Sequence, residues 1–318
     1  MHIVIIGAGA VGGYFGALLH ETGTDVTFVA RNESLHALRN RGLRIHTPEG
    51  LRDVPVQSVS SLSEIESADI VLLATKTLSA PELPESLPRG AVLVTTQNSV
   101  EMPQIAIDTF GPAAVIPGVV RSFLIKRGPA EVEFAGGIRS FTFGSVDPAT
   151  QETVNELQKA LAKAGIEPIV HPAVMEDIWA KAMFVTCFGA LGALVDKPLG
   201  EIRTLYRADL RNLMQEVEEA GRALGIDLPS DIVETTLASL DRQSAQATSS
   251  MQRDLLDDLP SELDAQVGGV VRMAELGGRE ARMHRLILDV LYTPIEVNCS
   301  AHIIAKGKRV LKGRYALS

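Results

Sequence analysis

The residues HIVIIGAGAVG, numbers 2–12, contain the pattern that decides the fold of the N-terminal half. A β-branched run over 2–6 is followed at once by a G-x-G-x-x-G turn, and a helix-compatible stretch begins at residue 10. This order of strand, glycine turn and helix is typical of a dinucleotide-binding βαβ unit. The sequence therefore predicts a phosphate-binding turn made of Gly7, Ala8, Gly9, Ala10, Val11 and Gly12.

The three glycines of this turn have separate roles. Gly7 permits the tight turn, Gly9 lets the backbone approach a pyrophosphate, and Gly12 allows the helix to pack closely on the strand. The first N–H groups of the helix and its dipole attract phosphate. A glycine-rich turn that only packs tightly is the alternative interpretation.

Further apolar strands follow in alternation with helical segments, which predicts right-handed βαβ units and a parallel sheet covered by helices. The segment 112–145 is short-stranded and glycine-punctuated, and we expect antiparallel additions at the sheet edge there. A helix over 149–165 follows. The expected strands are 2–6, 25–30, 69–75 and 91–96, and the expected crossover helices are 10–22, 32–41 and 100–109.

Beyond Pro172 the hydrophobic period changes to about 3.6 residues, which indicates helices. We therefore expect an α/β protein with an N-terminal Rossmann-type doubly wound sheet, residues 1–170, and a C-terminal mainly α-helical domain, residues 171–318. The latter would carry substrate-binding and catalytic groups. The clearest helical stripe is formed by Leu210, Leu213, Met214, Val217, Ala220 and Leu224.

Composition excludes several classes of protein. The chain has 318 residues and a formal net charge of −9, so a nucleic-acid partner has no electrostatic support. The chain has only two cysteines, Cys187 and Cys299, which are too few for a thiolate metal site. No two histidines have the i, i+4 spacing of a helical zinc site, so we expect no bound metal. The uncharged run 3–19 contains too many glycines for a signal peptide or a membrane span. We expect a cytoplasmic protein without a membrane partner.

The end of the second strand indicates which dinucleotide is bound. An NAD-binding domain usually places an acidic residue there, whereas this sequence has Arg31. A guanidinium can bind a 2′-phosphate through two hydrogen bonds, so NADP(H) is favoured as the cofactor. A simple surface arginine is the alternative, and Glu33 lies nearby.

Lys181 is the candidate proton donor of the second domain. It lies in the apolar segment 176–184, EDIWAKAMF, so its ammonium is expected to be partly buried or to face a cleft. Partial desolvation would lower its pKa toward the range that suits a general acid. A lysine whose ammonium reaches solvent is the alternative.

These motifs together resemble those of the ketopantoate reductase (2-dehydropantoate 2-reductase) family over nearly the whole chain. The resemblance implies NADPH-dependent reduction of a 2-oxo acid, ketopantoate to pantoate in pantothenate biosynthesis, in a cleft between a Rossmann domain and a helical domain. The matching segments are Gly7 to Gly12, Arg31, Lys76, 97–100 (QNSV), 179–181 (WAK), 249–251 (SSM) and Glu262.

The resemblance also implies residue roles. Lys181 would be the general acid for the carbonyl oxygen, and Glu262 would orient substrate and lysine. Ser250 would bind the substrate carboxylate, Asn98 would lie near nicotinamide and substrate, and Lys76 would line the cofactor side of the cleft. Each residue also has a purely structural alternative as a turn, surface or helix residue.

The sequence departs from the family pattern where asparagines contact ketopantoate. A site without amide donors recognises a hydroxyl-bearing chain less well, so a more apolar 2-oxo acid is an alternative substrate. Two further hypotheses are a non-catalytic NADP-sensing protein and a β-hydroxyacid dehydrogenase, and a homodimer remains open as the assembly. The substituted positions hold Val185, Gly189, Leu199 and Ala247.

Overall fold

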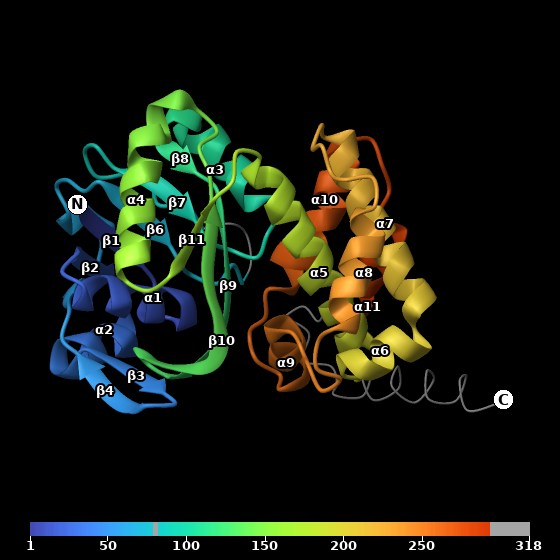
Figure 1. Ribbon diagram of the computed structural model, residues 1–318, viewed down its shortest axis with the longest axis horizontal. Coiled ribbons are helices and arrows are strands. Elements are labelled where there is room, and N and C mark those ends of the chain that lie inside the picture. The colour runs from blue at the N-terminus through green and yellow to red at the C-terminus, as the bar shows by residue number, and fades with distance from the viewer. Residues whose placement is uncertain (79–81, 293–318) are drawn as a thin grey trace. The chain divides into compact units, whose positions relative to one another are not determined.

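The computed structural model describes residues 1–78 and 82–292, which form two compact units (Figure 1). The units divide between Ile178 and Trp179, inside helix α5 (Val174–Val195). The boundary expected from the sequence, at residue 170, would assign the whole of this helix to the second domain, and that boundary stays a proposal. Cys299 lies outside the described residues.

The first unit contains a six-stranded, all-parallel sheet of Rossmann type, as predicted. Its order is β5-β2-β1-β6-β7-β8, which is 3-2-1-4-5-6 when its own strands are counted along the chain. The strands are β1 (His2–Ile6), β2 (Asp25–Val29), β5 (Gln57–Val59), β6 (Ile70–Leu73), β7 (Val92–Thr95) and β8 (Val115–Ile116).

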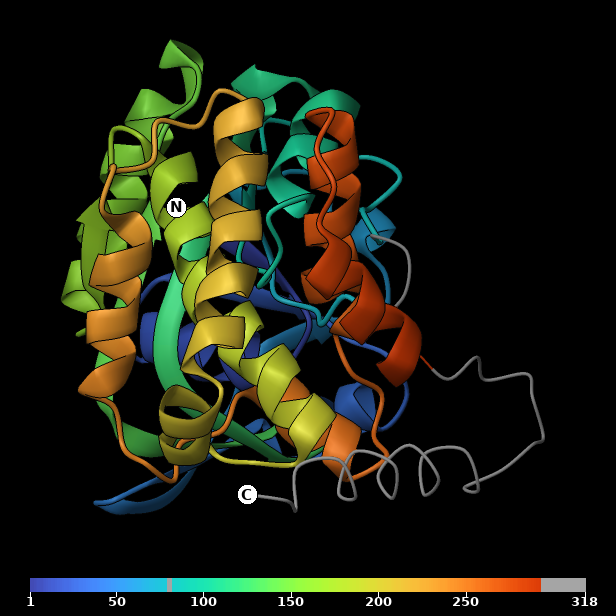
Figure 2. The same ribbon diagram turned by 90° about the vertical axis from the view of Figure 1, so that its right-hand side faces the viewer.

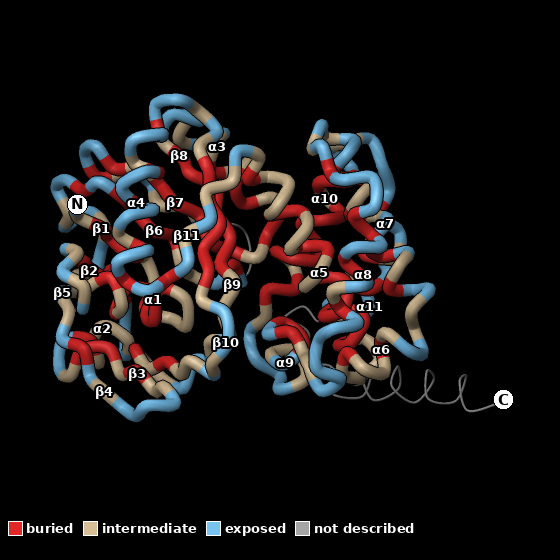
Figure 3. The backbone as a smooth tube through the Cα atoms, in the orientation of Figure 1, coloured by how far each residue is buried: buried red, intermediate tan, exposed pale blue. Residues whose placement is uncertain are grey.

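Both faces of the central strands β1, β6 and β7 are buried, because these strands are almost entirely apolar (Figure 3). Ile3 and Ile5 enter one core and Val4 the other. Side chains of α1 (Ala10–Glu21), α2 (Asn32–Arg41) and α4 (Gln151–Lys163) belong to the first core, and those of α3 (Met102–Phe110) to the second. Short 3₁₀ turns complete the unit at Leu62–Glu64, Pro112–Ala114 and Pro148–Thr150.

The prediction of edge additions over 112–145 is wrong in one respect. The antiparallel pair β9 and β10 exists, but it belongs to a second sheet with the order β11-β10-β3-β4 and β9 beside β10. The second sheet packs on α1, where Tyr14 stacks on Phe134 of β10 with 5.1 Å between ring centroids. These strands are β3 (Leu43–Thr47), β4 (Gly50–Val54), β9 (Gly118–Gly128), β10 (Glu131–Phe143) and β11 (Glu167–Val170).

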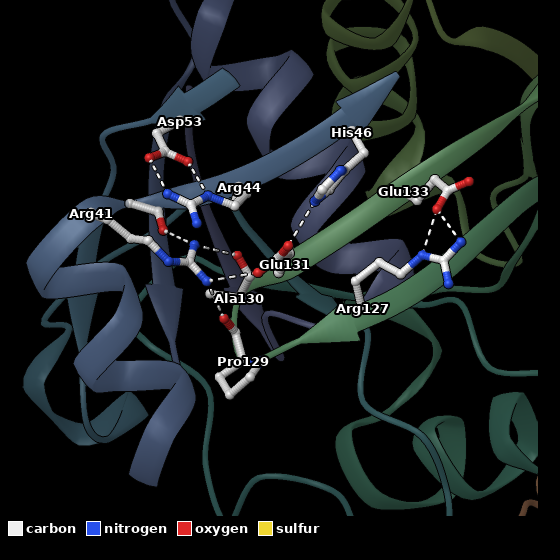
Figure 4. A network of polar contacts seen from close by, with 10 residues as sticks. Arg41, Arg44, His46, Asp53, Arg127, Pro129, Ala130, Glu131 and Glu133 are labelled. Carbon is white, nitrogen blue, oxygen red and sulfur yellow. Dashed lines mark hydrogen bonds and ion pairs between the residues drawn. The ribbon is translucent and has the colours of Figure 1, made fainter. Parts of the chain in front are cut away.

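A polar network fixes the turn between β9 and β10 (Figure 4). Arg41, at the end of α2, donates hydrogen bonds to the carbonyl oxygens of Pro129 (2.7 Å) and Ala130 (3.1 Å). Glu131 bonds to His46 of β3 at 2.6 Å. Ala130 is fully buried with φ of +50°, a conformation that these surrounding contacts hold in place.

The second unit is mainly helical, as predicted. Its central helix is α7 (Arg207–Ala223), which packs against α6, α8, α10 and α11. The predicted stripe on α7 is buried from Leu210 to Ala220, and Gly225, with φ of +82°, follows the end of the helix. Figure 2 shows the helices of this unit in yellow to red. The other elements are α6 (Leu199–Leu205), α8 (Ile232–Asp241), α9 (Ser250–Leu256), the π-helix η4 (Asp264–Gly268), α10 (Gly269–Leu276) and α11 (Arg282–Leu291).

Helix α5 is the one helix among the described residues that is long and apolar enough to cross a membrane, with a mean hydropathy of 1.7. Of its apolar window, 67% is buried inside the protein, as in the core helix of a globular unit. The length and hydropathy of α5 are therefore weak evidence for a membrane span.

The start of α11 is held by one partly buried carboxylate. Glu216 of α7 accepts hydrogen bonds from the backbone N–H groups of Met283 (2.7 Å) and His284 (3.1 Å) and from Nδ1 of His284 (2.8 Å). Burial alone would raise the pKa of Glu216, but these three hydrogen bonds outweigh it and hold the pKa below its ordinary value of 4.5.

We predict that Glu216→Gln lowers stability at neutral pH by about 1–3 kcal/mol, because charge-assisted hydrogen bonds are lost. Since the pKa of Glu216 is lower in the folded state, its contribution is fully present above about pH 5 and is lost as pH falls through the folded-state value. Urea denaturation at several pH values measures the difference between the two proteins, which should shrink toward acid.

Glu218→Gln is the control for this prediction. Glu218 lies on the same helix but pairs at the surface with Arg222, so its loss should change stability by less than about 0.5 kcal/mol. A difference between wild type and Glu216→Gln that stays constant from neutral to acid pH would contradict the assignment.

Candidate functional site

Four predicted site segments of the first unit come together at one edge of the parallel sheet. Gly7 follows β1, Arg31 follows β2, Lys76 follows β6 and Asn98 follows β7. These strands are neighbours in the order β2-β1-β6-β7, and all four are parallel. Ligands of open parallel sheets bind at the carboxyl ends of the strands, so this edge is the candidate binding site.

The glycine turn has the geometry that the three predicted roles require. Gly7 has φ of +104°, which favours glycine. A Cβ on Gly12 would lie 2.1 Å from the carbonyl oxygen of Gly7 and 2.9 Å from Cβ of Ala74, so only glycine permits this helix-to-strand approach. A Cβ on Gly9 would meet nothing within 4 Å, which leaves open space over the turn.

This space fits the phosphates of a dinucleotide. Within residues 1–78 and 82–292, no side chain caps the start of α1 at Gly9, so its first N–H groups can bind a ligand. Such groups, together with the helix dipole, bind anionic oxygens. The residues present therefore fit a dinucleotide whose pyrophosphate lies on the turn from Gly7 to Gly12.

Arg31 lies beside this turn with an exposed side chain. It is the N-cap residue of α2, and Asn32 after it has φ of +50°. Its guanidinium pairs with no carboxylate of residues 1–78 or 82–292, so it is available to bind an anionic ligand. Glu33 in the first turn of α2 is exposed as well.

The loops that hold Lys76 and Asn98 are tied together by buried polar groups. Thr96 donates from Oγ1 to the carbonyl oxygen of Leu73 (2.8 Å), and Gln97 donates from Nε2 to that of Thr75 (3.5 Å). Lys76 is exposed and Asn98 is half-buried. Sequence reasoning did not assign these linking roles, because they depend on two strand ends far apart in the sequence.

Lys181 lies on α5 in the second unit, and its residue is half-buried. Its neighbours Trp179, Ala182 and Met183 are buried, and Trp179 packs closely against Gly221 of α7. The predicted apolar helical setting of the lysine is confirmed. Cys187, further along the same helix, is fully buried, and burial raises the pKa of its thiol, which disfavours the reactive thiolate.

The two serines of the 249–251 motif have different surroundings. Ser249 is buried, and its Oγ caps α9 by accepting a hydrogen bond from the N–H of Gln252 at 3.0 Å. Ser250 is the first residue of α9 and is exposed. Its hydroxyl is therefore accessible to a ligand, whereas that of Ser249 is used for the cap.

Glu262 is 7% exposed and precedes the π-helix η4. Gln266 donates from Nε2 to its Oε2 at 3.4 Å. Asp264 and Arg272 pair at 3.0 Å across the π-helix, next to Gly268. π-helices are frequent at functional sites, and no spacing rule in the sequence indicated this one.

Among the described residues no three His, Cys, Asp or Glu side chains gather where they could hold a metal ion. Comparison with known proteins identifies the family of this chain. Residues 3–148 match the family model "Ketopantoate reductase PanE/ApbA", and residues 173–294 match the model of its C-terminal domain. The chain belongs to the ketopantoate reductase family. It is therefore an oxidoreductase of a pyridine-nucleotide-dependent family.

Relatives match over most of their length. The 2-dehydropantoate 2-reductase of Mesorhizobium japonicum is 30% identical over 303 residues, which cover 87% of this chain and 92% of that protein. The crystal structure of a PanE/ApbA family ketopantoate reductase from Ralstonia eutropha JMP134 has a TM-score of 0.80 at 26% identity, covering 97% of this chain and all of the other.

The same fold also occurs in a solved structure of a D-mandelate dehydrogenase. The ternary structure of D-mandelate dehydrogenase with NADH and anilino(oxo)acetate has a TM-score of 0.79 at 17% identity, covering 98% of this chain and all of the other. This likeness concerns the fold alone, so it does not identify a substrate or cofactor for the present chain.

Three of the four positions expected from the sequence to depart from the family pattern lie in packed regions of the helical unit. A Cβ on Gly189 would lie 2.3 Å from Oγ of Ser249, so an asparagine would displace that serine. The N–H of Leu199 donates to the carbonyl oxygen of Ala247 at 3.0 Å, and Leu199 is buried. None of the four departing positions supplies a side-chain amide.

We predict different outcomes for two alanine substitutions in the glycine turn. Gly12→Ala should lower stability by about 1–3 kcal/mol or more, because its methyl group would overlap the backbone of Gly7. Gly9→Ala should change stability by less than about 1 kcal/mol but weaken nucleotide binding at least about tenfold, because its methyl group projects into the phosphate space.

Urea denaturation and fluorescence titration with NADPH measure the two effects, and each variant is the control for the other. Unchanged NADPH affinity in Gly9→Ala would place the phosphates elsewhere.

Proposed function

We propose that this protein catalyses the NADPH-dependent reduction of a 2-oxo acid to a 2-hydroxy acid in the cytoplasm, with ketopantoate as the leading substrate. The observation that carries the proposal is the glycine turn with Arg31 beside it at one sheet edge, in a chain whose family model also covers the lysine-bearing helix. The relatives named 2-dehydropantoate 2-reductase support ketopantoate.

In the proposed reaction the first unit binds the nucleotide. Backbone N–H groups at the start of α1 would hold the pyrophosphate, and the guanidinium of Arg31 would bind the 2′-phosphate that distinguishes NADPH from NADH. Asn98 and Lys76, at the ends of β7 and β6, would orient the ring and line its pocket. The bound nucleotide supplies the hydride that reduces the C2 carbonyl.

The second unit supplies the proton. When the C2 carbonyl is reduced, Lys181 would donate a proton from Nζ to the carbonyl oxygen, so that C=O becomes CH–OH. We assign Glu262 to the orientation of this ammonium and of the substrate, and the exposed hydroxyl of Ser250 to the substrate carboxylate. Lys181 regains its proton from solvent before the next turnover.

A more apolar 2-oxo acid is the second candidate substrate. It is favoured by the four substituted positions, because a buried Leu199 and a tightly packed Gly189 offer no amide to a substrate hydroxyl. A binding site that hydrogen-bonds a substrate hydroxyl strongly rejects substrates that lack this hydroxyl. An apolar site distinguishes substrates that differ by one methylene group by only about 10–200-fold.

A panel assay tests the proposed function directly. We predict NADPH oxidation with ketopantoate or with a branched apolar 2-oxo acid, and we predict that Lys181→Ala lowers kcat at least about 100-fold, because proton donation contributes about 10²–10⁴. NADPH affinity should stay within about twofold. Lys159→Ala, at an exposed position on α4, is the control. Absence of turnover with every 2-oxo acid would defeat the proposal.

A separate prediction concerns the cofactor. Arg31→Glu should lower the ratio of kcat/KM with NADPH to kcat/KM with NADH by at least about 100-fold. A carboxylate repels the 2′-phosphate of NADPH and accepts hydrogen bonds from the ribose hydroxyl groups of NADH. Arg39→Glu, an exposed change on the same helix α2, should leave the ratio within about threefold. An unchanged ratio in Arg31→Glu would remove Arg31 from the 2′-phosphate site.

A further inference from the structure

The first turns of α5 are anchored to strand β9 of the Rossmann unit. Val119 of β9 packs with Val174 and Ile178 of α5 in a small buried cluster. Arg121 lies two residues further along β9, so its side chain leaves the strand on the same side as Val119. One face of β9 thus supplies both an apolar and a charged contact to α5.

The charged contact is a two-bond ion pair. Arg121 donates from one terminal nitrogen to Oδ2 of Asp177 at 2.7 Å and from the other to Oδ1 at 2.8 Å. The first nitrogen also donates to Oγ1 of Thr142 at 3.0 Å. The two ionic side chains are 31% and 23% exposed, so solvent screens this pair less than a fully exposed one.

Helix periodicity places Lys181 on the same face of α5 as Val174, Asp177 and Ile178. Positions i, i+3, i+4 and i+7 form one stripe along a helix. Val174, Asp177 and Ile178 are the first three members of such a stripe, and Lys181 is the fourth. Lys181 therefore leaves α5 about one turn, or about 5.4 Å, beyond Asp177 and from the same face.

We infer that Arg121 and Asp177 are positioning residues for proton donation by Lys181. They act by fixing the rotation of α5 about its own axis. The apolar contacts of Val119 with Val174 and Ile178 are non-directional. The two hydrogen bonds from Arg121 to the Asp177 carboxylate, in contrast, have a single favourable geometry. This inference rests on the proposed function, because it requires Lys181 to be the proton donor.

The size of the effect follows from helix dimensions. A rotation of α5 by about 20° would displace a group about 6 Å from its axis by about 2 Å. A misplacement of about 1 Å can cost about 100-fold in rate when a reacting group must meet its partner in one geometry. A small loss of rotational control therefore lowers turnover without removing a binding contact.

The test is a set of variants assayed with the 2-oxo acid that the panel identifies. Asp177→Asn keeps the shape of the side chain and removes its charge, and we predict that it lowers kcat at least about tenfold while KM and the NADPH dissociation constant stay within about twofold. Asp177→Glu should recover part of the loss. The double variant Arg121→Met/Asp177→Asn should be no slower than the slower single variant, because both changes break one pair.

Asp241→Asn is the matched control. Asp241, at the end of α8, accepts two hydrogen bonds from the guanidinium of Arg207, at the start of α7, at 2.7 and 2.8 Å. This pair lies within the helical unit and does not involve α5. It should lower the melting temperature about as much as Asp177→Asn and leave kcat within about twofold. If Asp177→Asn does not fold, Arg121→Lys takes its place with the same predicted loss of kcat.

The outcomes separate this inference from the proposed function. Normal kcat in Asp177→Asn, together with a large loss in Lys181→Ala, overturns the inference and leaves the proposed function intact. A fall in kcat equal to that of Asp241→Asn also overturns it, because that result indicates a general loss of stability. Normal kcat in Lys181→Ala defeats the proposed function itself.

Discussion

The close approach of helix α1 to strand β1 is the constraint on which the rest of the structure depends. α1 belongs to a core that contains residues of both sheets, so it needs small residues facing the parallel sheet and large ones facing the other. Gly12 and Gly16 meet the first need: a Cβ at Gly16 would lie 2.3 Å from the ring of Phe28. This packing fixes the start of α1, with its phosphate-binding N–H groups, at the edge where four strands end.

Much of this arrangement could be predicted from local sequence. The turn from Gly7 to Gly12, the four central strands and the stripe on α7 each depend on residues close together in the chain, where periodicity and glycine placement are informative. Arg31, Lys76 and Asn98 could be placed at the sheet edge because parallel strands end on the same side. The family itself is confirmed by the two matching models.

Other features depend on contacts that sequence spacing does not reveal. The antiparallel strands within 112–145 were expected at the edge of the parallel sheet, because nothing local shows that Phe134 of β10 stacks on Tyr14 of α1. The pair of Arg121 and Asp177 joins residues 56 positions apart. The cap made by Ser249 rather than Ser250, and the π-helix after Glu262, are details of backbone geometry that residue type alone does not specify.

The central claim is that a lysine of the helical unit donates the proton to a substrate reduced by a dinucleotide held on the glycine turn. A crystal structure of the protein with NADP⁺ and a 2-oxo acid tests it most directly. The account predicts Nζ of Lys181 within about 3 Å of the C2 carbonyl oxygen, with the pyrophosphate on the first N–H groups of α1. A complex in which that nitrogen lies more than about 10 Å from the carbonyl oxygen, beyond the reach of direct or water-relayed transfer, would contradict it.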